Sequence, residues 1–536
     1  MKEFNLWEID QAIKVMNTKT SRDPMGLSNR ILKNTGPLVR DRLLTLFNWC
    51  LIESVVPESW KHSVIRMLLK NGQPANEINS YRPISMTSCV ARLFERMVIG
   101  RLRDHLDKNK IIIQGQSGFR KARQTKDNLL TVIQTAQEGF NVGEKTLTVF
   151  FDIAAAFDKV WHAGVLYKLH KLGVPYYLIR VIGSFLHMRT FTVKIDDTHS
   201  EICKIKCGVP QGGVLSPTLF QVYINDIPMS AVTGERVILF ADDIAFIKRY
   251  KYKKSGKKIS HANSKAQIET QLYLGKLESW MNTWRLSLAP KKCCQITFSR
   301  AQNKEEDILN ITLYGEKIKS DPNPKFLGVV FDRKLNFESN VEAIKKKTGD
   351  RLNLLKILSY DRTWRLNTPT LVAMYKSLVL SVLDYAAITV GACSQRVKND
   401  YEVIQNNALR IILKISLLDK VRCEDLRIKA GVKSISERHK KLMRDYYERA
   451  LITNNPLISD LFEKYKEFKM RNHISPLLAM DGSIENLETL NLIKKHNALC
   501  LKDVEAWPTT FCLSPQIIKN LILDSYDSED IRQGVS

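Results

Sequence analysis

The chain has 536 residues, 44% of them hydrophobic and 26% charged, a balance typical of a globular protein with a sizeable core. Lysines and arginines number 82 against 56 aspartates and glutamates, and the net charge of +26 points to a polyanionic partner, nucleic acid before an anionic membrane surface. No apolar run reaches the roughly 18 residues of a membrane span, and the start, MKEFNLWEID, lacks the layout of a secretory signal. We therefore expect a soluble protein of the nucleus or cytoplasm that is neither secreted nor inserted in a membrane.

The first part of the chain is predicted to be mainly helical. Residues 1–75 have an amphipathic helical pattern, interrupted by SRDPMG at 21–26 and by VPESW at 56–60. The block from 80 to 140 is also helix-rich and basic, and SYRPISM and QSGFRKARQTKDN are its expected loops. The ten cysteines of the chain are scattered without a CxxC pair or a Cys/His cluster, so we expect reduced, mostly buried thiols and no structural metal.

The hydrophobic period changes from residue 146. TLTVFFDI predicts a buried strand, and FTVKIDD and KIKCGV alternate as the edges of a sheet do. Farther along, Ser216 and Pro217 predict a helix start, with the serine as N-cap and the proline at the first helical position.

The stretch ILFADDIAFIK, residues 238–248, predicts a β-hairpin, because β-branched and aromatic residues flank two adjacent aspartates. Such a turn usually favours Asn-Gly or Asp-Gly, and two neighbouring carboxylates repel each other. The pair is therefore either a solvated surface turn or a place where a cation offsets the repulsion. The basic run KRYKYKKSGKK that follows, residues 248–258, is expected to be an exposed loop, with a nucleic-acid contact as the alternative.

The second half of the chain returns to helices after one more strand. A helix is predicted with a core-facing stripe of large apolar side chains, and LSLAPKKCCQITFS is predicted to be the strand. The stripe consists of Tyr273, Leu277, Trp280, Met281 and Trp284. From about residue 340 the pattern is mainly helical, so a sheet-containing middle is flanked by helical segments and the fold class is α+β.

A third carboxylate favours the cation interpretation of the aspartate turn. Asp152 ends the apolar run Val149-Phe150-Phe151, so a strand end and a hairpin tip would bring three carboxylates to one end of a sheet. Oxygen ligands of this kind suit Mg²⁺ or Mn²⁺. Two such ions about 3.5–4 Å apart can clamp the attacking and leaving oxygens of an in-line phosphoryl transfer. We expect Asp152, Asp242 and Asp243 to be catalytic residues that bind two metal ions.

These motifs resemble those of reverse transcriptases. Asp152 with Phe157 five residues later, PQGGVLSP, FADD and KFLGVVFD occur in the order and approximate spacing of the palm motifs of that family. SYRPIS, SGFRKARQTKDNLL and VIQNNALRIIL are similar to segments of non-LTR retrotransposon polymerases of the jockey and wider LINE kind. The similarity runs from about residue 8 to about residue 450. No endonuclease precedes the polymerase segment here, which predicts a truncated or partly decayed copy that cannot nick its own target.

The resemblance implies roles for residues outside the aspartate trio. Phe157 would be the steric gate that excludes a ribose 2′-hydroxyl, although a core phenylalanine is the alternative. Nucleotide-binding roles are implied for Lys70 and Arg82, which would grip the triphosphate, for Gln211 and Gly212, and for Lys292, which would protonate pyrophosphate. The structural alternative for Gln211 and Gly212 is a turn before a helix, and the alternative for Lys292 is a solvated lysine pair. Template contacts are implied for Arg120, Lys121 and Arg123.

The resemblance also implies a right-hand polymerase architecture with an antiparallel palm sheet and a helical C-terminal region. The expected divisions are an N-terminal helical extension (1–59), fingers (60–145), a palm with the catalytic motifs (146–338), a helical thumb (339–450) and a C-terminal tail (451–536). The implied activity is that of an RNA-directed DNA polymerase that extends a DNA primer on an RNA template with deoxynucleoside triphosphates.

Two alternatives to this activity remain open from the sequence. The first is a catalytically inactive polymerase fold that only binds nucleic acid. The intact aspartate trio and Phe157 argue against it, because a decayed site has no physical reason to keep crowded carboxylates. The second is an RNA-dependent RNA polymerase, which Phe157 and Ala241 disfavour because that class generally has glycine before the aspartates.

Overall fold

The structure, a computed structural model, describes residues 2–19, 22–70, 72–230, 234–251, 259–300, 308–360, 366–389, 391–460 and 463. It consists of two compact units whose segments alternate along the chain. Unit 1 comprises residues 1–128, 147–297 and 302–321, and unit 2 comprises the remainder. A prediction that falls on residues 464–536, most of the expected C-terminal tail, lies outside the described residues.

Unit 1 contains two five-stranded sheets and the helices that cover them. Its helices are α1 (Leu6–Lys14), α2 (Asn29–Lys33), α3 (Pro37–Glu53), α4 (Glu58–Lys61), α5 (Cys89–Lys108), α7 (His162–Lys171), α8 (Tyr176–Leu186), α9 (Ser216–Tyr223) and α10 (Ile259–Thr283). The first sheet, called the β1 sheet, has the order β2-β1-β4-β5 with β6 also paired to β4. Its strands are β1 (His62–Leu69), β2 (Tyr81–Met86), β4 (Thr190–Ile195), β5 (Thr198–His199) and β6 (Cys203–Lys204).

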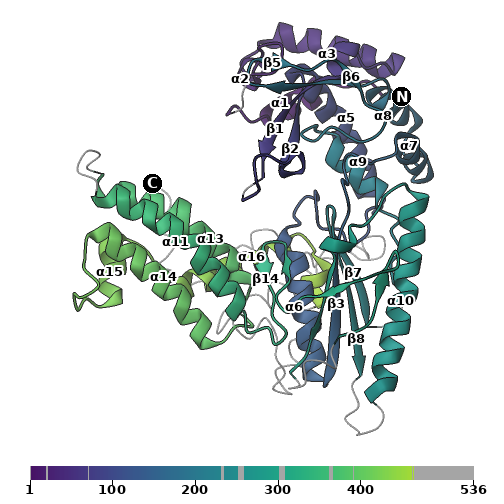
Figure 1. Cartoon of the computed structure of the whole chain (residues 1–536). Coiled ribbons are helices and arrows are strands. Elements are labelled where there is room, and N and C mark those ends of the chain that lie inside the picture. The colour runs from purple at the N-terminus through teal and green to yellow at the C-terminus, as the bar shows by residue number, and fades with distance from the viewer. Residues whose placement is uncertain are drawn as a thin grey trace, which may run out of the picture. The chain divides into compact units, whose positions relative to one another are not determined.

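The second sheet of unit 1, called the aspartate sheet, has the order β12-β9-β3-β8-β7. Its strands are β3 (Glu144–Asp152), β7 (Glu235–Phe240), β8 (Asp243–Lys251), β9 (Cys294–Phe298) and β12 (Lys319–Ser320). A small ladder of β10 (Thr312–Leu313) and β11 (Glu316–Lys317) completes the unit. Helix α10 runs along this sheet beside β8 (Figure 1). The predicted strand at TLTVFFDI, the hairpin and the following helix are therefore confirmed.

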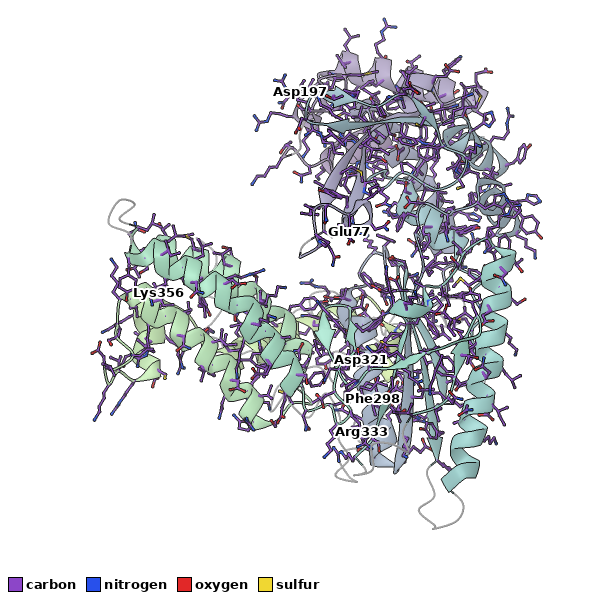
Figure 2. The ribbon with its side chains drawn as sticks, in the orientation of Figure 1. Glu77, Asp197, Phe298, Asp321, Arg333 and Lys356 are labelled. Carbon is purple, nitrogen blue, oxygen red and sulfur yellow. The ribbon has the colours of Figure 1, made fainter. Side chains whose placement is uncertain are left out.

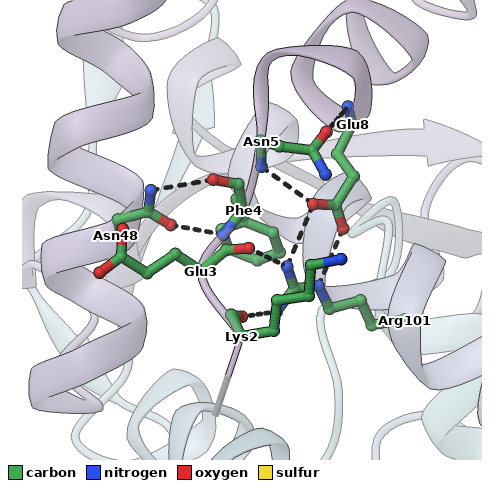
Figure 3. A network of polar contacts seen from close by, with 7 residues as sticks. All are labelled: Lys2, Glu3, Phe4, Asn5, Glu8, Asn48 and Arg101. Carbon is green, nitrogen blue, oxygen red and sulfur yellow. Dashed lines mark hydrogen bonds and ion pairs between the residues drawn. The ribbon is translucent and has the colours of Figure 1, made fainter.

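The start of the chain is fastened to the body of unit 1 (Figure 3). Arg101 on α5 donates two hydrogen bonds to the Glu8 carboxylate, at 2.8 and 3.0 Å, and its guanidinium lies 4.3 Å from the centre of the Phe4 ring. Asn48 on α3 accepts from the Phe4 N–H and donates to the Phe4 carbonyl, and Asn5 and Glu8 form a capping box at the start of α1. Residues 1–53 thus pack as part of unit 1.

Strands replace helix or loop at two places in the β1 sheet. The expectation of helix up to residue 75 is wrong over His62–Leu69, and the expected loop SYRPISM contains β2. Both strands form because they pair with each other in antiparallel register, Leu68 opposite Arg82, while β1 also pairs in parallel with β4. Glu77 lies in the β1–β2 connection, and Asp197 marks the β4–β5 turn (Figure 2).

The aspartate sheet also differs from two expectations. It is not antiparallel throughout, since β12 pairs with β9 in parallel. The basic run expected to be an exposed loop begins inside β8, where Lys248 is buried and forms ion pairs with Glu235 and, at 2.6 Å, with Glu269. Residues 252–258 of that run lie outside the described residues.

Unit 2 is mainly helical, as predicted for the region after residue 340. It contains most of α6 (Thr125–Asn141), together with α11 (Glu338–Tyr360), α12 (Thr368–Tyr375), α13 (Ser381–Tyr385), α14 (Gln395–Leu413), α15 (Cys423–Ala430), α16 (Ile435–Ile452), β13 (Lys325–Phe326) and β14 (Val329–Val330). Asp384 accepts two hydrogen bonds from Arg438, at 2.6 and 2.7 Å, which joins α13 to α16. Gln405 on α14 accepts a hydrogen bond from the buried Tyr375 hydroxyl.

The structure bears on the expectations about membrane insertion and about the cysteines. One helical stretch, Thr368–Thr389, is long and apolar enough to cross a membrane by length and composition alone. Half of it is buried inside the structure, as in the core helix of a globular unit. The eight described cysteines are free thiols, four of them buried, whereas Cys203, Cys207 and Cys423 are exposed.

Candidate active site

The two adjacent aspartates lie at the tip of the β7–β8 hairpin. Phe240 pairs with Asp243, so Ala241 and Asp242 form the two-residue turn between the strands. Ala241 has a φ of 58°, in the left-handed region that a residue with a Cβ adopts at a cost of roughly 1–2 kcal/mol. The turn is therefore held in a conformation that its own residue type does not favour, and contacts from outside the hairpin must support it.

The third aspartate lies at the end of the neighbouring strand. Asp152 is the last residue of β3, which lies next to β8 in the aspartate sheet. Its backbone carbonyl accepts a hydrogen bond from the Ala289 N–H at 2.9 Å. Its carboxylate forms an ion pair with Lys292, with 3.2 Å between Nζ and Oδ2. The structure thus places Asp152 and Lys292 side by side, at the same end of the sheet as the hairpin tip.

The three carboxylates interact electrostatically. Burial, followed by repulsion from Asp152, raises the pKa of Asp242, and Arg82 acts in the opposite direction. Asp243 is exposed as a residue, yet partial burial of its carboxyl, followed by repulsion from Asp242 and Asp152, raises its pKa from 3.8 to about 6. In the described part of the chain, no group of three or more His, Cys, Asp or Glu side chains is arranged so that it could hold a metal ion as it stands. The aspartates therefore repel one another without forming a ligand shell.

The raised pKa of Asp243 predicts a pH-dependent stability. The folded protein holds the Asp243 proton more tightly than the unfolded chain does. The stabilising contribution of this protonated carboxyl to the free energy of unfolding is therefore fully present below pH 3.8 and is lost as the pH rises through about 6. Asp243→Asn should therefore stabilise the protein in EDTA at pH 7.5 and have little effect at pH 4. Solvent screening at this exposed residue limits the gain to about 1 kcal/mol. Urea denaturation of both proteins at both pH values measures the difference, and an equal change at the two values would contradict it.

The PQGG loop is fixed between α5 and the β1 sheet. Gly212 has a φ of 110°, and a Cβ there would lie 3.1 Å from the Ser85 carbonyl oxygen, so both its conformation and its space favour glycine. The Ser85 N–H donates to the Gln211 carbonyl at 2.8 Å, and the Gln211 amide donates to both oxygens of Asp158. A cavity of about 310 Å³ lies beside these residues and is also lined by Lys204 and Lys206.

The start of α9 differs from the prediction. The N-cap is Leu215 rather than Ser216, and no side chain of the local sequence caps the helix. Instead the buried carboxylate of Glu95 on α5 accepts from the N–H groups of Val214 and Leu215, at 2.7 and 3.0 Å. A residue 120 positions away thus fixes the loop that carries Gln211 and Gly212, which no local capping rule reveals.

The Phe157 ring lies half-buried in a small aromatic cluster. It stacks on Phe220 of α9 with 4.8 Å between ring centres, and the ring of Phe119 approaches at 6.2 Å edge-on. The Val209 N–H donates to the Phe157 carbonyl, which connects the turn after β3 to the irregular segment between β6 and the PQGG loop. Phe157 therefore has a packing role on one side and an accessible side as well.

The residues expected to grip a triphosphate lie at the end of the β1 sheet. Arg82 on β2 is exposed and acts on the Asp242 carboxylate, as its effect on that pKa indicates. Lys70, directly after β1, is also exposed, and its ammonium donates to the Asn79 carbonyl at 2.8 Å. The structure thus brings Arg82 toward the aspartates, whereas Lys70 is engaged by its own loop.

The predicted template-contacting residues differ in availability. The Arg120 guanidinium donates to the carbonyls of Ile113 and Gln116, at 3.1 and 3.2 Å, and so stabilises its own loop. Lys121 is exposed, and Arg123 is half-buried. Burial, followed by repulsion from Arg123, lowers the pKa of Arg120.

Sequence reasoning missed Gln116, which contacts the aspartate turn. Its buried side chain accepts a hydrogen bond from the Ala241 N–H at 3.1 Å, directly before Asp242. The available signal was a polar residue flanked by glycines in the loop GQSG, which is typical of a backbone that approaches another closely.

The residues of this site lie within a segment that matches a known protein family. Residues 68–331 match the reverse transcriptase (RNA-dependent DNA polymerase) family. The RNA-directed DNA polymerase from mobile element jockey of Drosophila melanogaster is 30% identical over 467 residues, which cover 86% of this chain and 49% of the relative. The jockey polymerase of Drosophila funebris is 29% identical and covers 83% of this chain and 47% of that protein.

A third relative belongs to another element. The probable RNA-directed DNA polymerase from transposon BS of Drosophila melanogaster is 29% identical over 77% of this chain and 45% of its own length. The chain thus spans about half the length of the curated relatives that it matches. Among solved structures, apo telomerase from Candida tropicalis superposes with a TM-score of 0.38 and 12% identity over 85% of this chain and 74% of that one, too low a score to support an inference.

Proposed function

We propose, because residues 68–331 match the reverse transcriptase (RNA-dependent DNA polymerase) family, that this chain is the polymerase of a non-LTR retrotransposon. It extends a DNA primer on an RNA template and consumes deoxynucleoside triphosphates. The observation that carries the proposal is the meeting of Asp152 with Asp242 and Asp243 at one end of the aspartate sheet, inside the matched domain.

Reverse transcriptases generally use divalent metal ions, and the aspartate cluster fits such ions. Its donors are carboxylate oxygens, and the mutual repulsion that raises the pKa of Asp242 and Asp243 is the kind that a divalent cation relieves. Asp152, Asp242 and Asp243 would hold two Mg²⁺ or Mn²⁺ ions. When bound, the ions supply charge stabilisation to the attacking 3′-oxygen and to the pyrophosphate leaving group.

The remaining side chains act on the nucleotide itself. Arg82, exposed and close enough to act on Asp242, would bind triphosphate oxygens with its planar fork, and Lys70 would assist from the neighbouring strand end. Lys292 would give a proton to the pyrophosphate, since its ammonium already lies 3.2 Å from Asp152.

Sugar selection and template placement come from the loops around the cluster. The accessible side of Phe157 would exclude a 2′-hydroxyl, and Gly212, with Gln211, would let backbone approach the incoming nucleotide. Template phosphates would be contacted by Lys121 and Arg123, with Arg120 chiefly fixing their loop.

The proposed site also suggests roles for the larger parts of the chain. We propose that strands β1 and β2 belong to the fingers (60–145) and the aspartate sheet to the palm (146–338), whose strands β4, β5 and β6 complete the β1 sheet. Helices α11 to α16 would form the thumb (339–450). The N-terminal helices (1–59) would support the fingers, and residues 451–536 are assigned no role.

A primer-extension assay tests the proposal. The purified chain with Mg²⁺ or Mn²⁺ should elongate a DNA primer on an RNA template with deoxynucleotides, and a gel shift on the same duplex measures binding separately. Binding without any extension would instead support an inactive nucleic-acid-binding protein. Equal use of ribonucleotides would support an RNA polymerase.

A further inference from the structure

A short segment outside the two main sheets runs beside the end of β7. The Leu239 N–H donates to the Gly115 carbonyl at 2.8 Å, and the Ser117 N–H donates to the Leu239 carbonyl at 2.9 Å. Gln116 therefore pairs in parallel with Leu239 and extends the aspartate sheet by one bridge, just before the turn. We call residues 115–118 the GQSG segment.

The Gln116 side chain continues from this bridge to the turn. It is 2% exposed, and its Oε1 accepts from the Ala241 N–H at 3.1 Å and from the Gly118 N–H at 2.7 Å. Its Nε2 lies at 3.5 Å from the Ala241 carbonyl oxygen, so both backbone groups of the residue before Asp242 face one side-chain amide. These contacts hold Ala241 at its unfavourable positive φ.

The two glycines of the segment are required by the closeness of this contact. A Cβ at Gly118 would lie 2.2 Å from the Ala241 nitrogen, and a Cβ at Gly115 would lie 2.6 Å from the Val237 carbonyl oxygen. Neither backbone atom can yield without moving the hairpin.

The segment itself is fixed from behind. Arg120 donates to the Gln116 carbonyl, and the buried Gln221 of α9 donates to the Gly118 carbonyl at 3.0 Å. A displacement of the GQSG segment would therefore displace the turn with it.

We propose that Gln116 is a positioning residue that fixes the orientation of the Asp242 and Asp243 carboxylates for catalysis. Loss of its amide leaves the Ala241 N–H without its acceptor and allows Ala241 to relax toward negative φ, which rotates the adjacent Asp242. The inference rests on the proposed polymerase function and adds to it the residue that sets the geometry of the aspartate turn.

The test compares Gln116→Met, which keeps length and volume without hydrogen bonds, with Gln114→Met at an exposed position two residues earlier. For Gln116→Met we expect kcat to fall on the order of tenfold to a hundredfold, as for a small misplacement of catalytic groups. The KM for deoxynucleotide and the affinity for the primer–template duplex should stay within about twofold, because Gln116 touches neither. Gln114→Met should match the wild type.

A readout without turnover accompanies the kinetics. Mn²⁺ alone should raise the melting temperature of the wild type, and Gln116→Met should need a higher Mn²⁺ concentration for half of that rise. If the wild-type chain extends no primer, the proposed function is wrong. The Mn²⁺ titration, which needs no turnover, still tests the role of Gln116. An unchanged Mn²⁺ response together with wild-type kcat would overturn the inference.

A rescue variant separates positioning from general stabilisation. Ala241→Gly in the Gln116→Met background removes the Cβ that disfavours positive φ, so it should restore part of the lost kcat. A purely structural role of Gln116 predicts no such recovery. If Gln116→Met does not fold, Gln116→Asn replaces it, since its amide is one methylene too short to reach the turn; wild-type kcat in that variant would overturn the inference.

Discussion

Replacing Asp242 with asparagine is expected to reduce primer extension at least about a thousandfold while leaving duplex binding within about twofold. The amide keeps the shape of the side chain but removes a charge that, in the proposed mechanism, would contribute several kcal/mol to holding the ions and the transition state. Each 1.36 kcal/mol is tenfold in rate. We expect binding to the duplex to depend on phosphate contacts elsewhere on a chain of net charge +26. Single-turnover extension and a gel shift on the same primer–template measure the two quantities.

Asp197→Asn is the matched control for this variant. Asp197 lies at the β4–β5 turn with a fully exposed side chain, 3.7 Å from Lys194, and it makes the same charge change away from the aspartate sheet (Figure 2). It should keep wild-type extension. Extension by Asp242→Asn at the wild-type rate would remove Asp242 from the metal-binding set and leave a basic nucleic-acid-binding fold.

The sequence predicted the parts of the site that depend on local patterns. The hairpin at residues 238–248 and the strand that ends at Asp152 consist of consecutive β-branched and aromatic residues, so their period identified them without knowledge of their partners. The prediction that the three aspartates lie close together followed from these two elements, because the end of a strand and the tip of a hairpin can lie at the same end of one sheet.

The parts that were missed depend on partners far away in the chain. His62–Leu69 forms a strand because β2 and β4 pair with it, and Lys248 is buried because Glu235 and Glu269 neutralise its charge. Tertiary pairing overrides local propensity in such cases. The hydrogen bonds from Val214 and Leu215 to Glu95 at the start of α9 also depend on a partner far away in the chain.

The Gln116 contact shows why a site needs more than its motifs. The FADD motif identifies the carboxylates, yet its alanine, Ala241, has a φ of 58° that is unfavourable for alanine. The support comes from a loop more than a hundred residues earlier, and only the paired glycines at 115 and 118 carry a trace of it in the sequence.

Replacing Phe157 with alanine is expected to weaken the preference for deoxynucleotides over ribonucleotides by on the order of a hundredfold. Rejection of one added hydroxyl by an apolar surface has about this limit, because it depends on a steric clash without a lost hydrogen bond. The loss should appear as a higher kcat/KM for ribonucleotides with that for deoxynucleotides little changed. Competition between the two sugars during single-nucleotide incorporation measures the ratio.

Phe220→Leu separates this gate from simple packing. Phe220 is fully buried and stacks on the Phe157 ring at 4.8 Å, so its replacement weakens the same aromatic contact while keeping the ring at position 157. Both variants should lower the free energy of unfolding in urea, since each removes buried aromatic surface. Only Phe157→Ala should change sugar selection, and Phe157→Tyr should preserve it. If Phe157→Ala lost stability with its sugar preference intact, the ring would be a core residue and the 2′-hydroxyl would have to be rejected by another group.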